Sequence, residues 1–552
     1  MAFTMSSVDY TPDQLATLST HDIETVLDRD HVYLPRNSKQ KRFQNWAKTF
    51  SCEPERVFRP STATHVLLIT ELARRYSKPL RAAGVGHSPS DLACTSSWQV
   101  RTDAFSSPLS ITKVGDKTIA HVQPGLVLHD LHRWLKENKL ALSNCGSISD
   151  QTVAGVITTC THGSGWTFPV LTDLVEEISV VVAGGDIDPK DGSKGKVRSI
   201  TCSKEVEADL FHATICGLGL TGIITDIKIR VEPAFRLKEI KTPMPMTDLL
   251  DLAFSSPIAA TATTTTTTSS SSESTPLLAS TSKELADDVD REVVRFEDFG
   301  QGMLDEIAQS AEHVRMWYYP QSDQVMIARA NRTYEEPIPG NPWAEWWGKF
   351  KGYHMTQLFL FTARFFPWLT KWVGRWVWWL QSDGSVAQDD GYKVYTFDCL
   401  FPQYTTEWAI PYDQTRETLV EIRDWLKQEK NPVHWPIEIR FTAPDDIWLS
   451  PSYGLRTTWI GIVQYRPYGY SVPYEELFER FTAILKDHDG RPHWAKQHDF
   501  TRAKLAEVYP KFEKFCEVRD KWDPENRWAC QYGERHFGKE STQRSDRAYK
   551  AV

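Results

Sequence analysis

A glycine-rich turn at residues 216–222 constrains the fold of this 552-residue chain more strongly than any other segment. Its sequence, CGLGLTG, has the Gly-x-Gly-x-x-Gly spacing that is typical of dinucleotide-binding domains. In those domains the glycines follow a strand and open a helix, whose N-terminus holds the pyrophosphate. Here a helix-like stretch, EADLFHATI, precedes the glycines, and an alternating strand, IITDIKIRV, follows them. We therefore expect a turn from helix to strand, at which the backbone approaches a bound ligand, and no doubly wound nucleotide fold.

Short helices and many short strands share the rest of the chain. Apolar residues recur at helical spacing in segments 64–80, 126–140 and 474–488. Strands are predicted from alternating or β-branched runs, among them LRAAGV, LVEEISVVVAGG, YKVYTFDCLF, PIEIRFTAP and RTTWIGIVQYRP. This mixture predicts an α+β fold, and the length of the chain predicts two domains.

Composition narrows the classes of function. The formal net charge is −9 and no basic stripe or tail is present, so we expect no nucleic-acid partner. The nine cysteines include no Cys-x-x-Cys pair, and the N-terminus lacks a basic region followed by an apolar run. These features predict an intracellular protein that is not secreted and has no disulfide framework. The helical pair His129 and His132 has no third ligand nearby, so no metal site is expected.

Two segments have unusual compositions. Residues 259–284 form a Thr/Ser tract with little apolar surface, which predicts a mobile loop inserted in a domain. Residues 343–380 hold eight tryptophans, but neither apolar run in this Trp-rich segment reaches the roughly 20 residues that a membrane-spanning helix needs. Two interpretations stay open. The segment is either a buried helical pair or an interfacial element lying on a membrane. In the second case its basic side consists of Lys349, Lys351, Arg364, Lys371 and Arg375.

The first candidate site is the loop RAAGVGHSPSD at residues 81–91. Gly84 and Gly86 flank Val85 and allow close approach of the backbone to an anionic ligand such as a pyrophosphate. His87 and the small Ser88 follow directly. By spacing alone, His87 is better explained as a loop histidine that is hydrogen-bonded to the backbone, because the Gly-x-Gly-His motif is short.

Three further segments carry candidate residues. GSISDQTVAGVITTCTHGSG, at 146–165, is dense in small and hydroxyl residues that would pack against a large flat ligand. The residues singled out there are Gly146, Ser147, Thr152, Gly155, His162 and Gly163. In PIEIR, Glu438 and Arg440 lie on the same face of a strand, which also suits a plain surface ion pair. GRPHWAKQH, at 490–498, brings together His493, Trp494 and Lys496.

Taken in order, these segments resemble the aldonolactone oxidase group of the vanillyl-alcohol-oxidase flavoprotein superfamily, over residues 45–540. The resemblance implies an FAD-binding domain in two pieces, 45–235 and 490–540, with a cap domain for the substrate, 236–489, between them. The cap contains the Thr/Ser insert and the Trp-rich segment. Residues 1–44 are expected to form an N-terminal arm that is irregular apart from a short helix.

The resemblance also assigns roles to the candidate residues. His87 matches the position at which oxidases of this group attach FAD covalently, and Gly146 matches a position thought to give oxygen a path to the flavin. The remaining cofactor-binding residues would be Gly84, Val85, Gly86, Ser88, Ser147, Thr152, Gly155, His162, Gly163, Ile224, His493 and Trp494. Glu438, Arg440 and Lys496 would be catalytic. Arg440 and Lys496 would supply positive charge, and Glu438 would hold Arg440 and contact the substrate hydroxyl.

The function implied by the resemblance is oxidation of D-arabinono-1,4-lactone, or a related aldono-1,4-lactone, with O2 reduced to H2O2. It further implies a place on a mitochondrial membrane and a role in making an ascorbate-like product. Three alternatives stay open. They are an aldonolactone dehydrogenase that reduces cytochrome c, an alditol oxidase, and a catalytically silent membrane scaffold. The first two differ in electron acceptor or substrate, and the third would lack a flavin.

Overall fold

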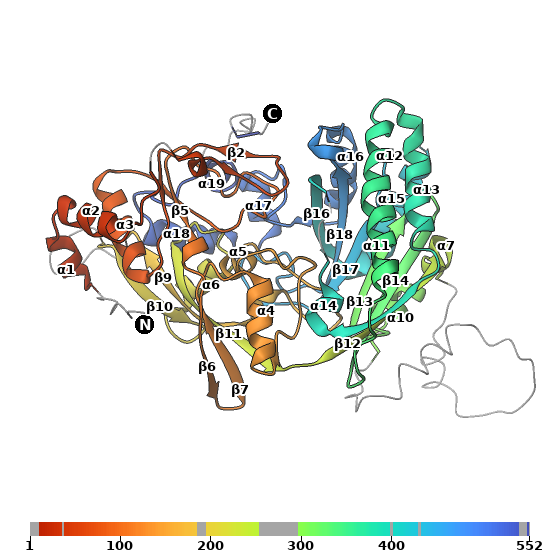
Figure 1. The fold of residues 1–552 in the computed structure, drawn as a ribbon, viewed down its shortest axis with the longest axis horizontal. Coiled ribbons are helices and arrows are strands. Elements are labelled where there is room, and N and C mark those ends of the chain that lie inside the picture. The colour runs from red at the N-terminus through yellow and green to blue at the C-terminus, as the bar shows by residue number, and fades with distance from the viewer. Residues whose placement is uncertain are drawn as a thin grey trace, which may run out of the picture.

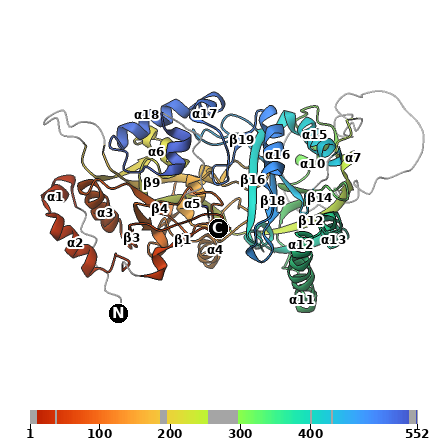
Figure 2. The ribbon, with the colours of Figure 1, turned by 90° about the horizontal axis from the view of Figure 1, so that it is seen from above.

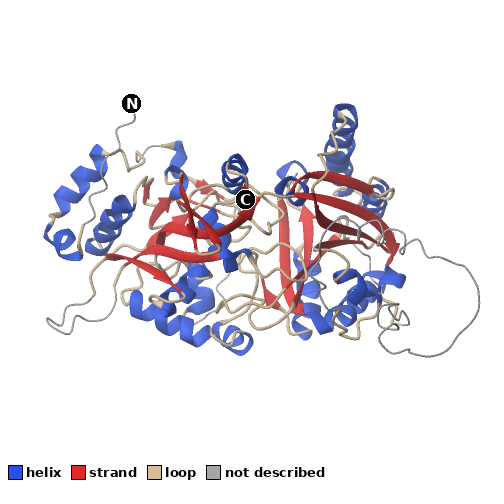
Figure 3. Ribbon diagram, turned by 90° about the horizontal axis from the view of Figure 1, so that it is seen from below, coloured by secondary structure: helices blue, strands red, loops and turns tan. Residues whose placement is uncertain are grey.

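The computed structural model describes residues 10–35, 38–184, 195–252, 296–397, 401–428, 432–539 and 549–550. The Thr/Ser insert at 259–284 therefore lies outside the described residues. The chain forms two lobes, one from its N-terminal part together with its C-terminal helices and the other from the middle of the chain (Figure 1). Each lobe contains a sheet flanked by helices (Figure 3), in agreement with the predicted α+β fold.

The N-terminal part of the first lobe contains a small parallel sheet with the strand order β3 (Arg56–Phe58), β5 (Trp98–Arg101) and β4 (Leu80–Ala83). Helix α3 (Ala63–Arg75) covers this sheet, and β1 (Phe43–Gln44) pairs with β2 (Ser51–Cys52) nearby. The expected irregular arm is wrong for residues 10–35. Two helices, α1 (Pro12–Thr17) and α2 (Thr20–Arg29), bury Leu15, Ile23 and Leu27 in the same apolar cluster as α3.

A six-stranded antiparallel sheet makes up the rest of the first lobe. Its strands are β10 (Arg198–Ser203), β9 (Val175–Val182), β11 (Ile223–Pro233), β7 (Lys117–Val122) and β6 (Pro108–Val114), with β8 (Leu140–Ala141) paired to β11. The helices of this part are α4 (Leu128–Glu137), α5 (Val153–Thr158), α6 (Ala208–Ile215), α17 (Arg502–Val508), α18 (Phe512–Trp522) and α19 (Gln531–Phe537). The glycine-rich turn lies between α6 and β11, so the predicted order of helix, turn and strand is confirmed.

The second lobe is built on an eight-stranded antiparallel sheet. Its strand order is β15 (Ser385–Asp390), β12 (Arg236–Pro245), β14 (Gln324–Thr333), β13 (His313–Tyr319), β17 (Ile437–Thr442), β18 (Thr457–Tyr465), β16 (Gln403–Pro411) and β19 (Arg491–Pro492). Its helices include α7 (Met246–Leu249), α10 (Met303–Ala308), α14 (Gly391–Tyr395), α15 (Thr415–Gln428) and α16 (Glu475–Asp487). The strand predicted at YKVYTFDCLF is wrong, because α14 occupies its first part, and β16 was not predicted.

The Trp-rich segment forms helices on the second lobe. These are α11 (Pro342–Lys349), a π-helical turn (Phe350–Met355), α12 (Thr356–Ala363), a 3-10 turn (Pro367–Leu369) and α13 (Thr370–Trp379). Leu360, Val373 and Val377 are buried in one apolar cluster with Met326 and Tyr465 of the sheet. Helix α11 projects from the lobe, and none of its residues is buried (Figure 2). The expected buried helical pair is therefore correct for α12 and α13, which contribute buried residues, and wrong for α11. Among the described helices, none is long and apolar enough to cross a membrane.

Candidate active site

The loop that follows β4 holds His87 at the edge of a cavity. Gly86 adopts a positive φ of 78°, and its carbonyl accepts a hydrogen bond of 2.8 Å from the Trp46 backbone N–H. The Trp46 indole stacks on the His87 ring, with 5.0 Å between the centroids. Asn45 donates its side-chain N–H to the Ser88 carbonyl at 3.0 Å. Residues 45 and 46 thus fix both the backbone of this loop and the plane of the imidazole.

The walls of this cavity come from segments far apart in the sequence. Eight of the predicted cofactor-binding residues line it, namely Gly84, Val85, Gly86, His87, Ser88, Thr152, Gly155 and Ile224. The glycine-rich turn contributes Leu218, Gly219 and Gly222. Gly219 has a φ of +67°, which suits glycine, and Arg81 binds the carbonyls of Leu218 and Gly219. The turn therefore lines the same cavity as the His87 loop.

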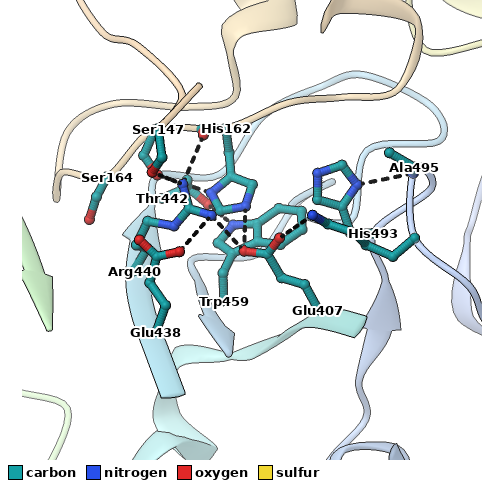
Figure 4. Close-up of polar contacts among 12 residues, drawn as sticks. Ser147, His162, Ser164, Glu407, Glu438, Arg440, Thr442, Trp459, His493 and Ala495 are labelled. Carbon is teal, nitrogen blue, oxygen red and sulfur yellow. Dashed lines mark hydrogen bonds and ion pairs between the residues drawn. The ribbon is translucent and has the colours of Figure 1, made fainter. Parts of the chain in front are cut away.

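A second set of predicted residues forms a buried ionic cluster (Figure 4). On β17, Arg440 donates through Nη1 to Ser147 Oγ at 3.2 Å and lies 3.5 Å from Glu438 Oε2. Nη1 also lies 3.4 Å from the carbonyl of His162, whose ring stacks on Trp459 with 3.7 Å between the centroids. Arg440 thus bridges a strand of the second lobe to a loop of the first.

Glu407 on β16 stands at the centre of this cluster, and the sequence did not single it out. Its Oε1 accepts Arg440 Nη2 at 2.7 Å and lies 3.2 Å from His162 Nε2. Its Oε2 lies 3.8 Å from Lys496 Nζ. The one available signal was a single acidic residue inside TTEWAIP, where its neighbours are typical of a buried strand.

Burial and neighbouring charges set the protonation of these groups. Burial by itself would raise the pKa of Glu407, but Arg440, His162 and Lys496 together hold that pKa well below its ordinary value. For His162, burial and the nearby Arg440 lower the pKa to about 4, against the opposing effect of Glu407. Burial also lowers the pKa of His87, and the charge of Lys496 adds to this effect. His87 is therefore neutral at neutral pH, and Lys496 lies within electrostatic reach of it.

Two polar atoms of the cluster are buried without a hydrogen-bond partner among the described residues. They are Glu438 Oε1 and Arg440 Nε. A buried polar atom without a partner costs free energy on the order of 1–3 kcal/mol, so such atoms are rare unless a ligand or water completes them. One acceptor and one donor thus remain for a small polar ligand.

The other predicted cofactor residues lie elsewhere. Trp494 is fully buried, donates to the Leu449 carbonyl at 2.6 Å and packs between the rings of Tyr509 and Phe537, so it belongs to the core of the first lobe and does not line the cavity. The ring of His493 lies beside that of His162, near Glu407. Gly146, Ser147, His162 and Gly163 do not line the cavity either. A Cβ at Gly163 would lie 2.1 Å from Asn144 Oδ1, which explains this glycine by packing.

One group among the described residues has the spacing of a metal site. Ligand atoms of His162, Glu407 and His493 lie within 4.8 Å of one another. Both oxygens of Glu407, however, already face Arg440 and Lys496, and a divalent cation would stand next to these two positive charges. We therefore interpret the group as an ion-pair network.

Comparisons with known proteins agree with this geometry. A family described as FAD binding domain matches residues 54–188, and one described as D-arabinono-1,4-lactone oxidase matches residues 288–536. The chain is 32% identical to L-gulonolactone oxidase of Scyliorhinus torazame, over 90% of this chain and 98% of the relative. It is 27% identical to a putative D-arabinono-1,4-lactone oxidase of Neurospora crassa, over 93% and 89% of the two chains.

A solved structure of a solvent-stable cholesterol oxidase superposes with a TM-score of 0.67 at 14% identity, over 90% of this chain and 97% of the other. That likeness shows the fold alone. The sequence matches extend across both lobes and include both the cavity and the ionic cluster. The chain belongs to the aldonolactone oxidase family of FAD-dependent oxidoreductases.

Proposed function

We propose that the protein oxidises the 2-hydroxyl carbon of D-arabinono-1,4-lactone, or a closely related aldono-1,4-lactone, and passes the electrons to O2. The observation that carries this proposal is the meeting of Glu438, Arg440 and Lys496, which come from two separate segments. Arg440 lies 3.5 Å from Glu438, and Arg440 and Lys496 both face the same buried carboxylate, Glu407. Lys496 also lies within electrostatic reach of His87, one of the residues that line the cavity.

The cavity suits FAD. Glycine backbone on two sides offers N–H groups without side chains, which is what a pyrophosphate and a flat ring system require. Gly84 has no room for a methyl group, because the Thr152 side chain packs against it. We propose that His87 bonds covalently to the flavin. In support, its ring is held by Trp46, and its lowered pKa leaves a neutral imidazole with a free nitrogen lone pair.

Bound FAD would supply the acceptor for the hydride that leaves the substrate carbon. The protein would supply orientation and charge. Arg440 and Lys496 place fixed positive charge in a buried site, where it stabilises developing negative charge better than in water. Glu438 Oε1, which has no partner among the described residues, would accept a hydrogen bond from the substrate hydroxyl. Arg440 Nε would donate to a second substrate oxygen.

The test combines two measurements on the purified protein. Acid precipitation should leave the yellow flavin in the pellet for wild type and remove it from the pellet in His87→Ala. His129→Ala, an exposed histidine on α4, serves as the control and should stay yellow. The wild type should also form H2O2 from D-arabinono-1,4-lactone in air. A colourless wild type, or one without lactone turnover, would sink the proposal.

The same assays separate the alternatives. An aldonolactone dehydrogenase would reduce cytochrome c with the lactone but form little H2O2 in air. An alditol oxidase would form H2O2 faster from xylitol than from the lactone. A catalytically silent scaffold would have neither flavin nor turnover.

We further propose that the Trp-rich segment contacts a membrane surface. Support comes from the exposure of its aromatic side chains, such as Trp343 at 71%, Phe365 at 65% and Trp368 at 66%. Side chains of this kind are favoured at membrane interfaces. Lys349, Arg364, Lys371 and Arg375 lie exposed among them, and Lys351 lies half-buried over the Trp379 ring. A mitochondrial membrane and a role in making an ascorbate-like product remain parts of this proposal, and they rest on family resemblance.

A further inference from the structure

We infer that Glu407 is a positioning residue of the active site, which holds Arg440 away from Glu438 so that Glu438 stays free for the substrate hydroxyl. This inference rests on the proposed function and deepens it, because it adds a residue that acts through Arg440, His162 and Lys496. Neither the sequence motifs nor the cavity singled out Glu407.

The sheet explains why the Glu407 carboxylate reaches the cluster. Strand β16 pairs with β18 on one side and β19 on the other, at the side of the second lobe that faces the first (Figures 1 and 2). Glu407 lies opposite Gly461 on β18, where a Cβ would come within 3.3 Å of Glu407 Cγ. The glycine therefore leaves room for the glutamate side chain. The backbone carbonyl of Glu407 accepts a hydrogen bond from the His493 N–H at 3.0 Å, which connects β16 to the loop that carries Lys496.

One carboxylate thus gathers three groups from three parts of the chain. His162 comes from the first lobe, Arg440 from β17, and Lys496 from the segment after β19. Oε1 receives Arg440 and faces His162, while Oε2 faces Lys496. Because the Glu407 side chain is almost wholly buried, water does not screen these contacts.

The distances from Arg440 to the carboxylates of Glu407 and Glu438 show which of the two it binds. Arg440 Nη2 lies 2.7 Å from Glu407 but 3.5 Å from Glu438. If Glu407 lost its charge, Arg440 would move toward Glu438, the remaining carboxylate within reach. The free Oε1 of Glu438 would then be engaged by the guanidinium, and Lys496 would lose its counter-charge. Glu407 therefore determines the direction in which the Arg440 guanidinium points, and it leaves Glu438 Oε1 free to bind the substrate.

The experiment compares Glu407→Gln with Glu71→Gln in the full-length holoenzyme. The control, Glu71 on α3, is also a buried glutamate paired with arginines, Arg74 and Arg75, but it lies on the first lobe outside the cluster. The glutamine at 407 keeps the shape of the side chain and removes its charge. We expect both variants to bind FAD, as judged by visible absorbance. Glu407→Gln alone should lower kcat by roughly 100-fold.

The pH profile provides a readout that a purely structural role would not move. Without the negative charge, the positive groups around position 407 release their protons more readily, so the alkaline limb of kcat/KM should shift to lower pH. Glu71→Gln should keep the wild-type limb. The inference is overturned if Glu407→Gln keeps wild-type kcat, KM and pH profile.

A second variant covers the case in which Glu407→Gln does not accumulate as a folded flavoprotein. Glu407→Asp keeps the charge but withdraws the carboxylate by one methylene. It should show a reduced kcat with an unshifted pH profile, and a wild-type kcat would overturn the inference. Failure of the proposed function itself looks different, because the wild type would then oxidise no lactone at all.

Discussion

Gly84 and Thr152 come from loops almost seventy residues apart and touch so closely that a Cβ at Gly84 would lie 2.4 Å from Thr152 Oγ1. Thr152 is also the N-cap of α5, where its Oγ1 accepts the Gly155 N–H at 3.3 Å. The threonine side chain is therefore held in place and cannot swing aside. This contact joins the His87 loop to the opposite wall of the cavity.

The first prediction concerns this contact. Gly84→Ala should cost about 1–3 kcal/mol of unfolding free energy by overpacking and should reduce the FAD content of the purified protein. Thr152→Ala should cost about 1 kcal/mol through the lost cap. In the double variant the methyl group at 84 meets no Oγ1, so the two losses should be less than additive. Urea unfolding and flavin absorbance measure both effects.

A control for this cycle is Gly348→Ala in α11. A Cβ at Gly348 meets nothing within 4 Å, and alanine favours a helix over glycine, so this variant should keep its FAD content and be at least as stable as wild type. Strictly additive losses at 84 and 152 would contradict the packing argument.

The second prediction concerns the guanidinium of Arg440. Arg440→Lys keeps a positive charge but loses the fork that reaches Ser147 and Glu407 together. We expect kcat for the lactone to fall by roughly 100-fold or more, measured as oxygen uptake per bound flavin. Arg329→Lys, on strand β14, removes a comparably buried guanidinium that donates to Ser310 and Thr242, away from the cluster. It should lower the melting temperature and leave kcat per flavin unchanged. Equal losses of kcat in both variants would argue against a specific role for Arg440.

The third prediction concerns the dependence of stability on pH. Burial raises the pKa of Asp445 to about 7, above its value in the unfolded chain. The folded state therefore holds this proton over a range where the unfolded state has lost it. The stability that Asp445 contributes is full below about pH 4 and is lost as pH rises to about 7. Asparagine at position 445 cannot lose a proton. The free energy of unfolding of Asp445→Asn, relative to that of wild type, should therefore rise by an amount on the order of 3 kcal/mol between pH 4 and pH 8.

Urea unfolding of both proteins at the two pH values checks this, and the difference between them cancels the contributions of other groups. Asn should retain the hydrogen bond from the Ile447 N–H, which Asp445 Oδ1 accepts at 3.1 Å. A difference that does not change with pH would show that Asp445 titrates as an ordinary carboxylate.

The fourth prediction concerns the Trp-rich segment. Wild type should sediment with vesicles that contain anionic lipid, and less so at high salt. Replacing Trp343, Trp346 and Trp347 by serine should weaken binding by roughly tenfold or more, because these side chains lie exposed along α11. Tyr76→Ser, an exposed aromatic residue on the first lobe, should have no effect. Wild type that stays in the supernatant with every vesicle would refute the membrane proposal.

Local patterns predicted much of the fold. The helices at 64–80 and 126–140 and the strand at IITDIKIRV appear in the structure as α3, α4 and β11. Each has a strong period of its own, and that period depends on neighbours within a few residues. The same holds for Glu438 and Arg440, which share one face of β17 because side chains alternate along a strand.

Only the tertiary structure decided which of these residues meet. Glu407 could not be predicted, because its role depends on β16 lying between β18 and β19, and strand order is not written in any local period. Trp494, which lies next to His493 in the sequence, was predicted to bind the cofactor, but its side chain packs into the core. The sequence by itself determined the strongly periodic elements, the glycine-rich segments and the family. The partner of each buried charge was set by long-range packing, because the free energy of a buried ion depends on the groups around it and not on its neighbours in the chain.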